Sequence, residues 1–390
     1  MASRPLTILH AAETIRGGVA SVLRAHLAAQ NKADSVGRLV VVVPSNQVSD
    51  LELADLRVTP VTFRRAGRTV WALIAFSWVF LRTLLQERPD IVHLHSSFAG
   101  ALGRLILLSV RLVVRPKVVY CPHGFVFIIP GYSERSRGLL TRVELVLTAV
   151  TDAIICVSQY ELQLALSQGF RPEKLCLINN GIDIEMPATA SSSATSRLRR
   201  DSNDLKNDKR IELLFVGRLD YAKGFDVLYS TFRQLDSTLF HLTVVGERVL
   251  SDLPEYSSLP NMQRVGWLPP HQLAEYYSAA DVLLVPSRWE AFGLVVVEAA
   301  AFGCPALASD APAIAQLIED GVTGRVFKLT DPNTLVSILQ NTDKAGWSKM
   351  GENANAQVAP RYTAARMCQE TLHLYSTLMS PYVPLGNSRS

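Results

Sequence analysis

The sequence predicts an α/β protein built from two doubly wound, Rossmann-like units, each with a parallel sheet. Short apolar runs rich in β-branched residues recur along the chain, and each is followed by a longer stretch with helical spacing. These runs are continuously apolar rather than alternating, which is typical of parallel strands covered by helices on both faces. A chain of 390 residues also suits two domains of roughly 180 residues each better than one.

The predicted strands fall into two sets, one in each half of the chain. In the first half they are residues 7–12, 39–43, 91–95, 117–121, 153–157 and 175–178. In the second half they are residues 211–216, 241–245, 262–265, 281–285, 305–308 and 325–327. Each strand is expected to lead into a helix, so the informative polar residues should be those that follow the strands.

A polar stretch separates the two sets. Residues 187–210 are rich in Ser, Asn, Asp and Arg and lack an apolar period, which predicts a flexible linker or insertion. The first domain is therefore placed at 1–186 and the second at 211–360. Residues 361–390 are predicted to form a helix that crosses back to the first domain, followed by a disordered tail.

Composition limits the function classes. The net charge of +4 excludes a strongly basic nucleic-acid binder and permits a local basic patch. The five cysteines are scattered and never form C-x-x-C, so neither a disulfide framework nor a zinc site is expected, and a reducing cytoplasm fits best. The N-terminus lacks a charged segment followed by an apolar core, so no export signal is expected.

Paired glycines follow the first predicted strand. Gly17 and Gly18 stand at the turn into a helix expected from about Ala20. Glycines at such a turn let the backbone approach a phosphate or a sugar closely. A tight turn without a ligand is an equally good interpretation of these two residues alone.

Two cations follow the strand at 211–216. Arg218 and Lys223 are flanked by Gly217 and Gly224. Arginine can hold two phosphate oxygens in a fork, and lysine acts as a point charge, so this loop suits a diphosphate. The competing interpretation is a solvated loop with incidental cations.

Two carboxylates follow the strand at 281–285. Glu290 is expected in a loop, because Phe292 and Gly293 precede the next helix, whereas Glu298 lies inside that helix among Val and Ala residues. Both side chains can accept hydrogen bonds from hydroxyl groups. Glu298 needs a polar partner in such apolar company, which weighs against its being an ordinary solvated acid.

Together these segments resemble the retaining glycosyltransferases of family 4, which have the GT-B fold of two Rossmann-like domains facing a central cleft. The resemblance covers nearly the whole chain, and its order and spacing make it specific. It rests on these stretches: Gly217-Arg218-Leu219 with Lys223-Gly224, Glu290 and Glu298 with Phe292-Gly293-Leu294, Asn180-Gly181-Ile182-Asp183, and Pro89-Asp90-Ile91-Val92-His93-Leu94-His95.

The resemblance implies a role for each matching residue. Arg218 and Lys223 would bind the donor diphosphate and stabilise the departing nucleotide, and Glu298 would accept from the ribose hydroxyls. His123, after the strand at 117–121, would lie near the reacting carbon. The transferred sugar would be held by Glu290, by Gly17 and Gly18, and by the amides of Phe292, Gly293 and Leu294; Gly217 completes the donor set.

The other histidines are not expected at the reaction. His93 and His95, on one strand, are predicted to face opposite sides of the sheet and to serve the core, with substrate contact as the alternative for His95 at the carboxyl end of the strand. His10 remains open, since it precedes the first glycine turn. The remaining histidines, predicted to be structural or solvent-facing, are His26, His241, His271 and His373.

The predicted activity is that of a metal-independent hexosyltransferase. Family membership implies retention of anomeric configuration, a UDP- or GDP-type donor and no cofactor. No Asp-x-Asp follows a strand, so no metal is expected. Bacterial enzymes of this kind build exopolysaccharide, capsule or lipopolysaccharide on a polyprenyl carrier. The alternatives are a sugar-nucleotide epimerase or a non-catalytic sugar-nucleotide binding subunit on the same fold.

The acceptor is expected on the first domain. The loop at 125–142 combines aromatics with Arg135, Arg137 and Arg142 and suits an anionic or lipid-linked acceptor, although a mobile surface loop is an equal alternative. The segments 69–85 and 103–117 mix basic, aromatic and aliphatic residues, the former after Arg64, Arg65 and Arg68, the latter with Arg104 and Arg111. They predict peripheral contact with an anionic membrane, with a buried core helix as the equal alternative. No nucleic-acid partner is expected.

Overall fold

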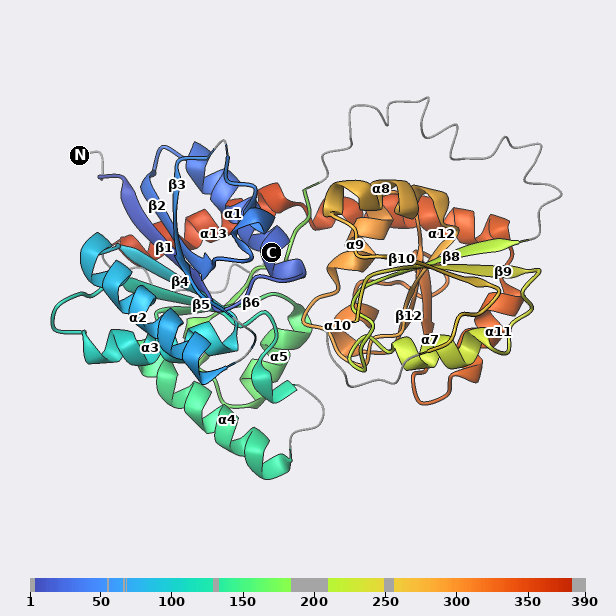
Figure 1. The fold of residues 1–390 in the computed structure, drawn as a ribbon, viewed down its shortest axis with the longest axis horizontal. Helices are drawn as coiled ribbons and strands as arrows, with labels where there is room; N and C mark the ends of the chain where they lie inside the picture. The colour runs from blue at the N-terminus through green and yellow to red at the C-terminus, as the bar shows by residue number, and fades with distance from the viewer. Residues whose placement is uncertain are drawn as a thin grey trace. The chain divides into compact units, whose positions relative to one another are not determined.

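The computed structural model describes residues 4–54, 56–65, 67, 69–128, 133–183, 210–248 and 256–380. Within this part of the chain lie two compact units (Figure 1). The first unit holds residues up to Asp183 together with those from Ala364 onward, and the second holds Ile184–Thr363. The predicted linker at 187–210 lies outside the described residues except for Arg210.

The first unit contains a sheet of seven parallel strands in the order β3-β2-β1-β4-β5-β6-β7. Its strands are β1 (Leu6–Ala12), β2 (Val36–Pro44), β3 (Val58–Phe63), β4 (Ile91–His95), β5 (Lys117–Cys121), β6 (Ala153–Cys156) and β7 (Leu175–Leu177). Its helices are α1 (Gly18–Lys32), α2 (Val70–Glu87), α3 (Ser97–Ser109), α4 (Glu134–Leu147), α5 (Gln159–Ser167) and α13 (Ala364–Met379). Short 3₁₀ turns occur at Val48–Leu51, Val126–Ile128, Thr148–Val150 and Pro172–Lys174.

The second unit contains a sheet of six parallel strands in the order β10-β9-β8-β11-β12-β13. Its strands are β8 (Ile211–Val216), β9 (Phe240–Val245), β10 (Met262–Gly266), β11 (Val282–Val285), β12 (Ala306–Ser309) and β13 (Gly324–Phe327). Its helices are α7 (Phe225–Phe232), α8 (Pro270–Ala279), α9 (Leu294–Ala301), α10 (Pro312–Ala315), α11 (Asn333–Asn341) and α12 (Lys344–Gln357), followed by a 3₁₀ turn at Ala359–Arg361.

The prediction of two parallel α/β units is confirmed, and every predicted strand is present. One strand was missed. β3 contains Pro60, which cannot donate to a sheet ladder, and so its segment did not resemble a strand. The structure explains the proline, because β3 lies at the edge of the sheet and pairs with β2 alone.

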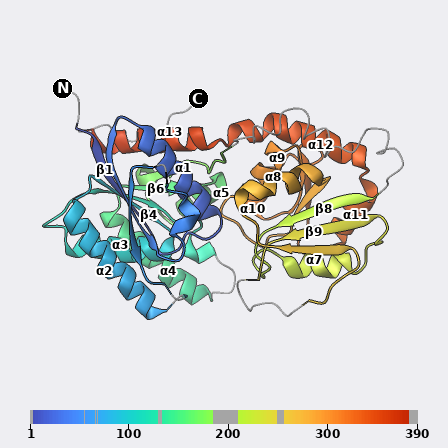
Figure 2. The same ribbon diagram turned by 45° about the horizontal axis from the view of Figure 1, so that its top comes forward.

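Alternation along the strands of the first unit separates two cores. Val40 and Val42 of β2 pack with Phe76 and Phe80 of α2 in one cluster. The intervening valines of β2 pack with Leu23 of α1 in another. Successive strand residues point to opposite faces, so α2 and α1 must cover opposite sides of the sheet. Figures 1 and 2 show α2, α3 and α4 on one side of this sheet and α1 with α13 on the other.

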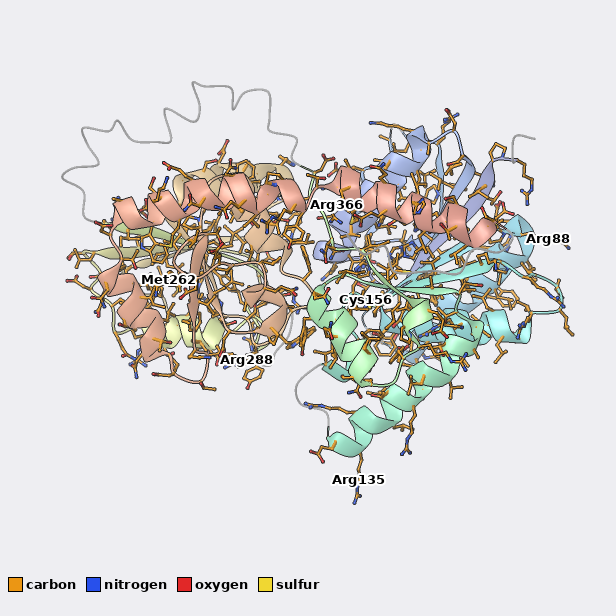
Figure 3. All side chains as sticks on the ribbon, turned by 180° about the vertical axis from the view of Figure 1, so that it is seen from behind. Arg88, Arg135, Cys156, Met262, Arg288 and Arg366 are labelled. Carbon is orange, nitrogen blue, oxygen red and sulfur yellow. The ribbon has the colours of Figure 1, made fainter. Side chains whose placement is uncertain are left out.

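Helix α13 is tied to the end of the first unit's own sheet. The amide of Ala364 donates to the carbonyl of Ile182 at 2.7 Å. Arg366 donates to the carbonyl of Asn179 at 2.8 Å, and the amide of Gly181 lies 3.3 Å from Sδ of Met367. Figure 3 shows Arg366 near the start of this helix. The Asn180–Asp183 stretch identified in the sequence is thus the docking point for the returning chain.

Candidate active site

The second sheet reverses its order between β8 and β11, which are neighbours in the sheet but far apart in sequence. β9 and β10 lie on one side of this pair, and β12 and β13 lie on the other. Ligands of doubly wound folds bind at the carboxyl ends of the strands where the order reverses. The loops after β8 and β11 carry the two charged motifs found in the sequence, so the topology brings those motifs together.

Glycines let these two loops pack backbone against backbone. Gly224 has a φ of +69°, and a Cβ there would lie 2.0 Å from the carbonyl oxygen of Pro286. Gly246, after β9, lies in the same way against the carbonyl of Gly217, which a Cβ would approach to 1.9 Å, so the loop after β8 is also packed against the loop after β9. The amide of Arg288 donates to the carbonyl of Ala222 at 2.8 Å and joins the loops after β8 and β11 directly. Any side chain at Gly224 would therefore separate the two charged motifs.

Arg218 and Lys223 are both arranged by Asp220, which the sequence reasoning did not single out. Nε of Arg218 lies 2.9 Å from Oδ2 of the fully buried Asp220, and half of the Arg218 side chain remains exposed. The amide of Lys223 donates to Oδ1 of Asp220 at 2.9 Å. A buried carboxylate between two cations holds both near one place. Its position inside the motif was the signal that could have identified it.

Lys223 and Glu290 form an ion pair between the two loops, Nζ contacting Oε1. Ser287 donates from Oγ to the same carboxylate oxygen at 3.1 Å. Glu290 lies before α9, which begins at Leu294, so its predicted place in the loop is confirmed. Both side chains of the pair are mostly buried, with 21% of Lys223 and 15% of Glu290 exposed. The ammonium group of Lys223 and the carboxylate of Glu290, which can accept from hydroxyl groups, therefore lie together where solvent access is limited.

Glu298 has the polar partner that its apolar surroundings required. Tyr277 of α8 donates its hydroxyl to Oε2 of Glu298 at 2.7 Å. Burial raises the pKa of Glu298, while the Tyr277 hydrogen bond and the charge of Lys223 act in the opposite direction. Nothing in the sequence pattern singled out Tyr277, because it comes from a different helix. α9 begins at Leu294, directly after Gly293 at a φ of +104°.

Phe292 and Leu294, two of the residues predicted to contact the sugar, lie at the start of α9. Phe292 is 2% exposed and meets Tyr362 edge to face, with ring centroids 5.3 Å apart. Its side chain is therefore core, and only its backbone amide is left for a ligand. Leu294 is the first residue of α9. Phe292 and Leu294 thus lie in the segment that joins Glu290 to the start of α9.

Gly17 and Gly18 lie at the start of α1 in the first unit. Gly17 is the N-cap residue with a φ of +74°, which favours glycine, and α1 begins at Gly18 rather than at Ala20. Both residues are exposed, and a Cβ at Gly17 would meet nothing within 4 Å. The turn is thus an open helix start, as anion or sugar contact requires.

His123 occupies a strained position after β5. Its φ is +50°, which is uncommon for a residue with a side chain, and Gly124 follows at +104°. The amide of Gly124 donates to Oε1 of Glu161 at 2.9 Å, and Val157 donates to Oε2 at 2.8 Å. Burial raises the pKa of Glu161 to about 7. This acid was missed in the sequence, and it holds the turn that presents His123.

The prediction that His93 and His95 face opposite sides is wrong. Residues two apart on a strand lie on the same face, and these two rings stack with centroids 4.1 Å apart. Strand register then adds His10, which pairs with His93 across β1 and β4. His26 of α1 lies 6.5 Å from His10, ring centroid to ring centroid. The expected core placement of His93 and His95 is confirmed, because both are fully buried.

Three of these imidazoles are close enough to consider as metal ligands. In the described part of the chain, His10, His93 and His95 form the one group whose ligand atoms all lie within 4.8 Å of one another. However, Nδ1 of His10 lies 3.0 Å from Nε2 of His95, a hydrogen-bond distance. The cluster is therefore best described as a hydrogen-bonded one.

The acceptor-side arginines lie on α4. Arg135, Arg137 and Arg142 are all exposed, and Figure 3 shows Arg135 pointing away from the start of this helix. Arg137 also lines a cavity of about 420 Å³ together with Phe127, Ile128, Tyr160 and Leu164. The lining also includes Glu134, so the cavity combines apolar walls with one cation and one carboxylate. Residues 129–132 of the adjoining loop lie outside the described residues.

Helices α2, α3 and α4 present an exposed apolar face, here called the apolar face. On α2 its central residues are Trp71, Ile74 and Trp78, with Trp71 78% and Trp78 67% exposed. The other large apolar side chains exposed on these helices and at the α3 end are Val70, Leu85, Phe98, Leu105, Leu108, Leu112, Val113, Leu139, Val143 and Val146. Two tryptophans exposed within two turns of one helix mark this face as a candidate contact surface.

By length and composition alone, α2 is one helix that could cross a membrane. Its other face, however, is built into the first core through Phe76, Phe80 and Leu84, which are fully buried. Two basic residues predicted for this surface are misplaced. Arg65 is mostly buried and pairs with the buried Glu13 at 2.8 Å. Arg104 is buried and pairs with Glu144 at 2.6 Å, so it connects α3 to α4. Arg68 lies outside the described residues.

Comparison with known proteins gives a consistent result. Residues 16–186 match the family described as Glycosyltransferase Family 4, and residues 197–346 match Glycosyl transferases group 1. An uncharacterized 41.2 kDa protein in the cps region of Klebsiella pneumoniae is 30% identical over 374 residues, covering 95% of this chain and all of that protein.

Two further relatives agree with this match. The UDP-Gal:alpha-D-GlcNAc-diphosphoundecaprenol alpha-1,3-galactosyltransferase of Escherichia coli is 26% identical, covering 75% of this chain and 77% of its own. The structure of Anabaena Alr3699/HepE in complex with UDP and glucose superimposes with a TM-score of 0.74 at 20% identity, covering 95% of this chain and 100% of that one. The chain therefore belongs to glycosyltransferase family 4, and its two parallel-sheet units are those of the GT-B fold.

Proposed function

We propose that this glycosyltransferase moves a hexose from a nucleotide diphosphate sugar to a lipid-linked glycan acceptor, with retention of configuration. The observation that carries the proposal is the convergence of Arg218, Lys223, Glu290 and Glu298 at the carboxyl ends of β8 and β11. The Escherichia coli relative is named for a UDP-sugar donor and a diphosphoundecaprenol acceptor, and the Anabaena structure holds UDP. Both support a uridine nucleotide as the first donor to test.

Arg218 and Lys223 are assigned to the donor diphosphate. The leaving nucleotide gains negative charge as the glycosidic bond breaks, and fixed cations stabilise that charge most when their positions are already set. Asp220 sets both positions, one through a side-chain contact and the other through the Lys223 amide. The half-exposed Arg218 is the more available of the two to an incoming phosphate.

Glu290 and Glu298 are assigned to hydroxyl groups of the donor. Glu298 is supported from behind by Tyr277 and retains other acceptor lone pairs for the ribose. Glu290, beside the amides that begin α9, suits the transferred sugar. Since Glu290 is paired with Lys223 in the absence of ligand, the donor diphosphate would share Lys223 with it.

Residues of the first unit are assigned to the transferred sugar and to the acceptor. His123 would lie near the reacting carbon, and the open turn at Gly17 and Gly18 would contact the sugar through its amides. The 420 Å³ cavity with Arg137 suits the junction of a diphosphate and an apolar chain. Such an acceptor is consistent with assembly of a cell-surface polysaccharide on a polyprenyl carrier.

The apolar face is assigned to the cytoplasmic surface of an anionic membrane. Exposed arginines surround its tryptophans and aliphatic residues: Arg82 on α2, Arg111 and Arg115 at the end of α3, and Arg135, Arg137 and Arg142 on α4. Apolar side chains rimmed by cations are what interfacial binding to acidic lipid requires. The protein would bind peripherally, because α2 remains part of the first core.

Neither a metal ion nor a cofactor is assigned to the reaction. The two donor-side carboxylates already have protein partners, Lys223 and Tyr277, and the cations Arg218 and Lys223 supply the charge that a metal would otherwise provide. Retention of the anomeric configuration is proposed from the resemblance to the retaining enzymes of family 4. It does not depend on the absence of a metal ion.

The experiment is a panel of UDP-, GDP- and ADP-sugars, each incubated with and without a polyprenyl diphosphate glycan acceptor. Acceptor-dependent release of nucleotide diphosphate, with an unchanged anomeric configuration in the product, is the expected result. Conversion of the donor sugar without an acceptor would instead show an epimerase. Binding of nucleotide sugar without any turnover would show a non-catalytic subunit.

A further inference from the structure

A chain of hydrogen bonds leads from His123 into the interior of the first unit. Nε2 of His123 lies 3.0 Å from Nδ1 of His95. Nε2 of His95 lies 3.0 Å from Nδ1 of His10. Nε2 of His10 lies 2.8 Å from Oε1 of Gln30, where the chain ends on an amide oxygen. We call these four residues the histidine relay.

Every ring in the relay is held neutral by burial. The pKa of His10 and that of His123 fall to about 4 from an ordinary 6.5, and that of His95 falls well below 6.5. Desolvation is the largest cause in all three cases. A neutral imidazole carries one N–H donor and one bare acceptor nitrogen. Each ring can therefore donate in one direction only.

The amide oxygen at the inner end sets that direction. Oε1 of Gln30 can only accept, so Nε2 of His10 carries the proton and Nδ1 of His10 is bare. Nδ1 of His10 must then accept from Nε2 of His95, which leaves Nδ1 of His95 bare. That nitrogen accepts in turn from Nε2 of His123.

We propose that Gln30, acting through His10 and His95, holds His123 in the single tautomer with Nε2 protonated and Nδ1 bare. Nδ1 is the ring nitrogen that the relay does not use, and the His123 side chain is only partly buried. His123 thus presents an acceptor to whatever it faces. Resting on the proposed function, that partner is a hydroxyl group of the sugar, and Gln30, His10 and His95 are positioning residues.

The relay orients His123 and does not conduct protons. A proton passed inward from His123 would have to leave through the amide oxygen of Gln30, which has no proton to release in exchange. His93 stands beside the relay rather than in it, since its Nδ1 pairs with the hydroxyl of Tyr375 at 2.6 Å. A metal ion would need the nitrogens of His10 and His95 that the relay joins to each other.

The test is a nitrogen-15 NMR spectrum of the full-length protein with labelled histidine, recorded through the long-range couplings that distinguish the two ring nitrogens. Loss of one set of signals in His123→Gln identifies His123. The expected spectrum shows its Nε2 protonated and its Nδ1 bare at neutral pH. A wild-type spectrum with Nδ1 protonated would overturn the proposal without any need for a relay variant.

Gln30→Leu removes the terminal acceptor without touching His123, three hydrogen bonds away. The expected result is a His123 signal shifted toward an average of the two tautomers. The matched control is His26→Leu, which removes a buried imidazole stacked on His10 that makes no bond within the relay. A His123 signal that stays unchanged in Gln30→Leu would contradict the proposal.

The two proposals can fail independently. Wild-type protein that transfers no sugar from any nucleotide donor, while His123 shows the expected tautomer, would overturn the proposed function and keep the relay. Normal transfer with Nδ1 of His123 protonated would overturn the relay and keep the function.

Discussion

Lys223 and Glu290 form an ion pair although 67 residues separate them in the chain. Their partnership depends on the glycine contacts that hold the loops after β8 and β11 together, above all Gly224 against Pro286. Each charge of the pair is neutralised by the other. In the proposed function, the donor diphosphate would meet a cation that is already positioned, and the sugar would meet a carboxylate that can accept from its hydroxyl groups.

Replacing either donor-side cation should abolish most of the activity. Lys223→Ala and Arg218→Ala are each expected to lower kcat about a hundredfold, because each removes roughly 3 kcal/mol of electrostatic stabilisation from the transition state. The measurement is nucleotide release at saturating donor. Lys328→Ala, which removes an exposed lysine from the same unit, is the matched control. Near-normal turnover with a normal melting temperature in either variant would remove the diphosphate assignment.

The two carboxylates should have separable kinetic effects. Glu298→Ala is expected chiefly to raise KM for the donor, since a ribose contact contributes equally before and during reaction, whereas Glu290→Ala should chiefly lower kcat. Tyr277→Phe keeps the Glu298 carboxylate and removes its hydrogen bond. It should therefore share the KM defect in weaker form. Identical defects in Glu290→Ala and Glu298→Ala would disprove the division of roles.

Activity should survive removal of divalent metal ions. Excess EDTA is expected to leave turnover unchanged, because Glu290 and Glu298 are engaged with Lys223 and Tyr277 rather than arranged around a cation. Mg²⁺-saturated EDTA is the control for ionic strength. A loss of activity that Mg²⁺ or Mn²⁺ restores would contradict the metal-independent assignment.

The apolar face should bind anionic vesicles reversibly. Co-sedimentation is expected with anionic but not with neutral vesicles and should weaken at high salt, which screens the arginines. The double variant Trp71→Ala, Trp78→Ala should reduce binding about tenfold or more, since each indole contributes apolar area to the contact. Trp267→Ala, which removes a similarly exposed indole from the second unit, is the matched control. Equal binding to both vesicle types, or to neither, would leave this face without the assigned membrane partner.

The buried histidines should make the first unit sensitive to acid. Five histidines, His10, His26, His93, His95 and His123, have pKa values below the ordinary 6.5. Below pH 6.5 these histidines bind protons in the unfolded chain but stay neutral in the folded unit. His10, for example, becomes protonated in the folded unit only near pH 4. The free energy of unfolding therefore falls as pH falls through this window. Glu161 acts oppositely, since folding raises its pKa from 4.5 to about 7, but it is one group against five.

His26→Leu isolates one part of this effect. The pKa of His26 falls to about 3, so removing it should reduce the dependence of unfolding free energy on pH by about 1.4 kcal/mol per pH unit. Urea denaturation between about pH 7 and about pH 5 measures this slope. His271→Leu, an exposed position in the second unit, should leave it unchanged. An identical slope in wild type and His26→Leu would show that His26 takes up protons equally in the folded and unfolded states.

Local patterns were sufficient for the fold and for the charged motifs. Continuous apolar runs identified the parallel strands, and glycines beside charges identified the loops that meet between β8 and β11. Partners supplied by other elements were not predictable in the same way. Tyr277 contacts Glu298 only because α8 packs beside α9. Pro60 argued against a strand at β3, and the sequence does not show that β3 lies at the sheet edge, where proline is tolerated.

The histidine relay shows the same limit more sharply. Gln30, His10, His95 and His123 come from a helix, two strands and a turn, and only strand register places His10 beside β4. A correct use of the two-residue period would have placed His93 and His95 on one face. It would not have shown that α1 supplies Gln30 to the same place, because that contact follows from how α1 packs across the sheet.

The return of α13 has a consequence for biosynthesis. The second unit is one continuous stretch of chain, whereas the first needs residues made before and after it, including Tyr375 against His93. Domains generally fold as units while the ribosome extends the chain. The later unit can therefore finish folding first, and the earlier one must wait for the last helix to emerge.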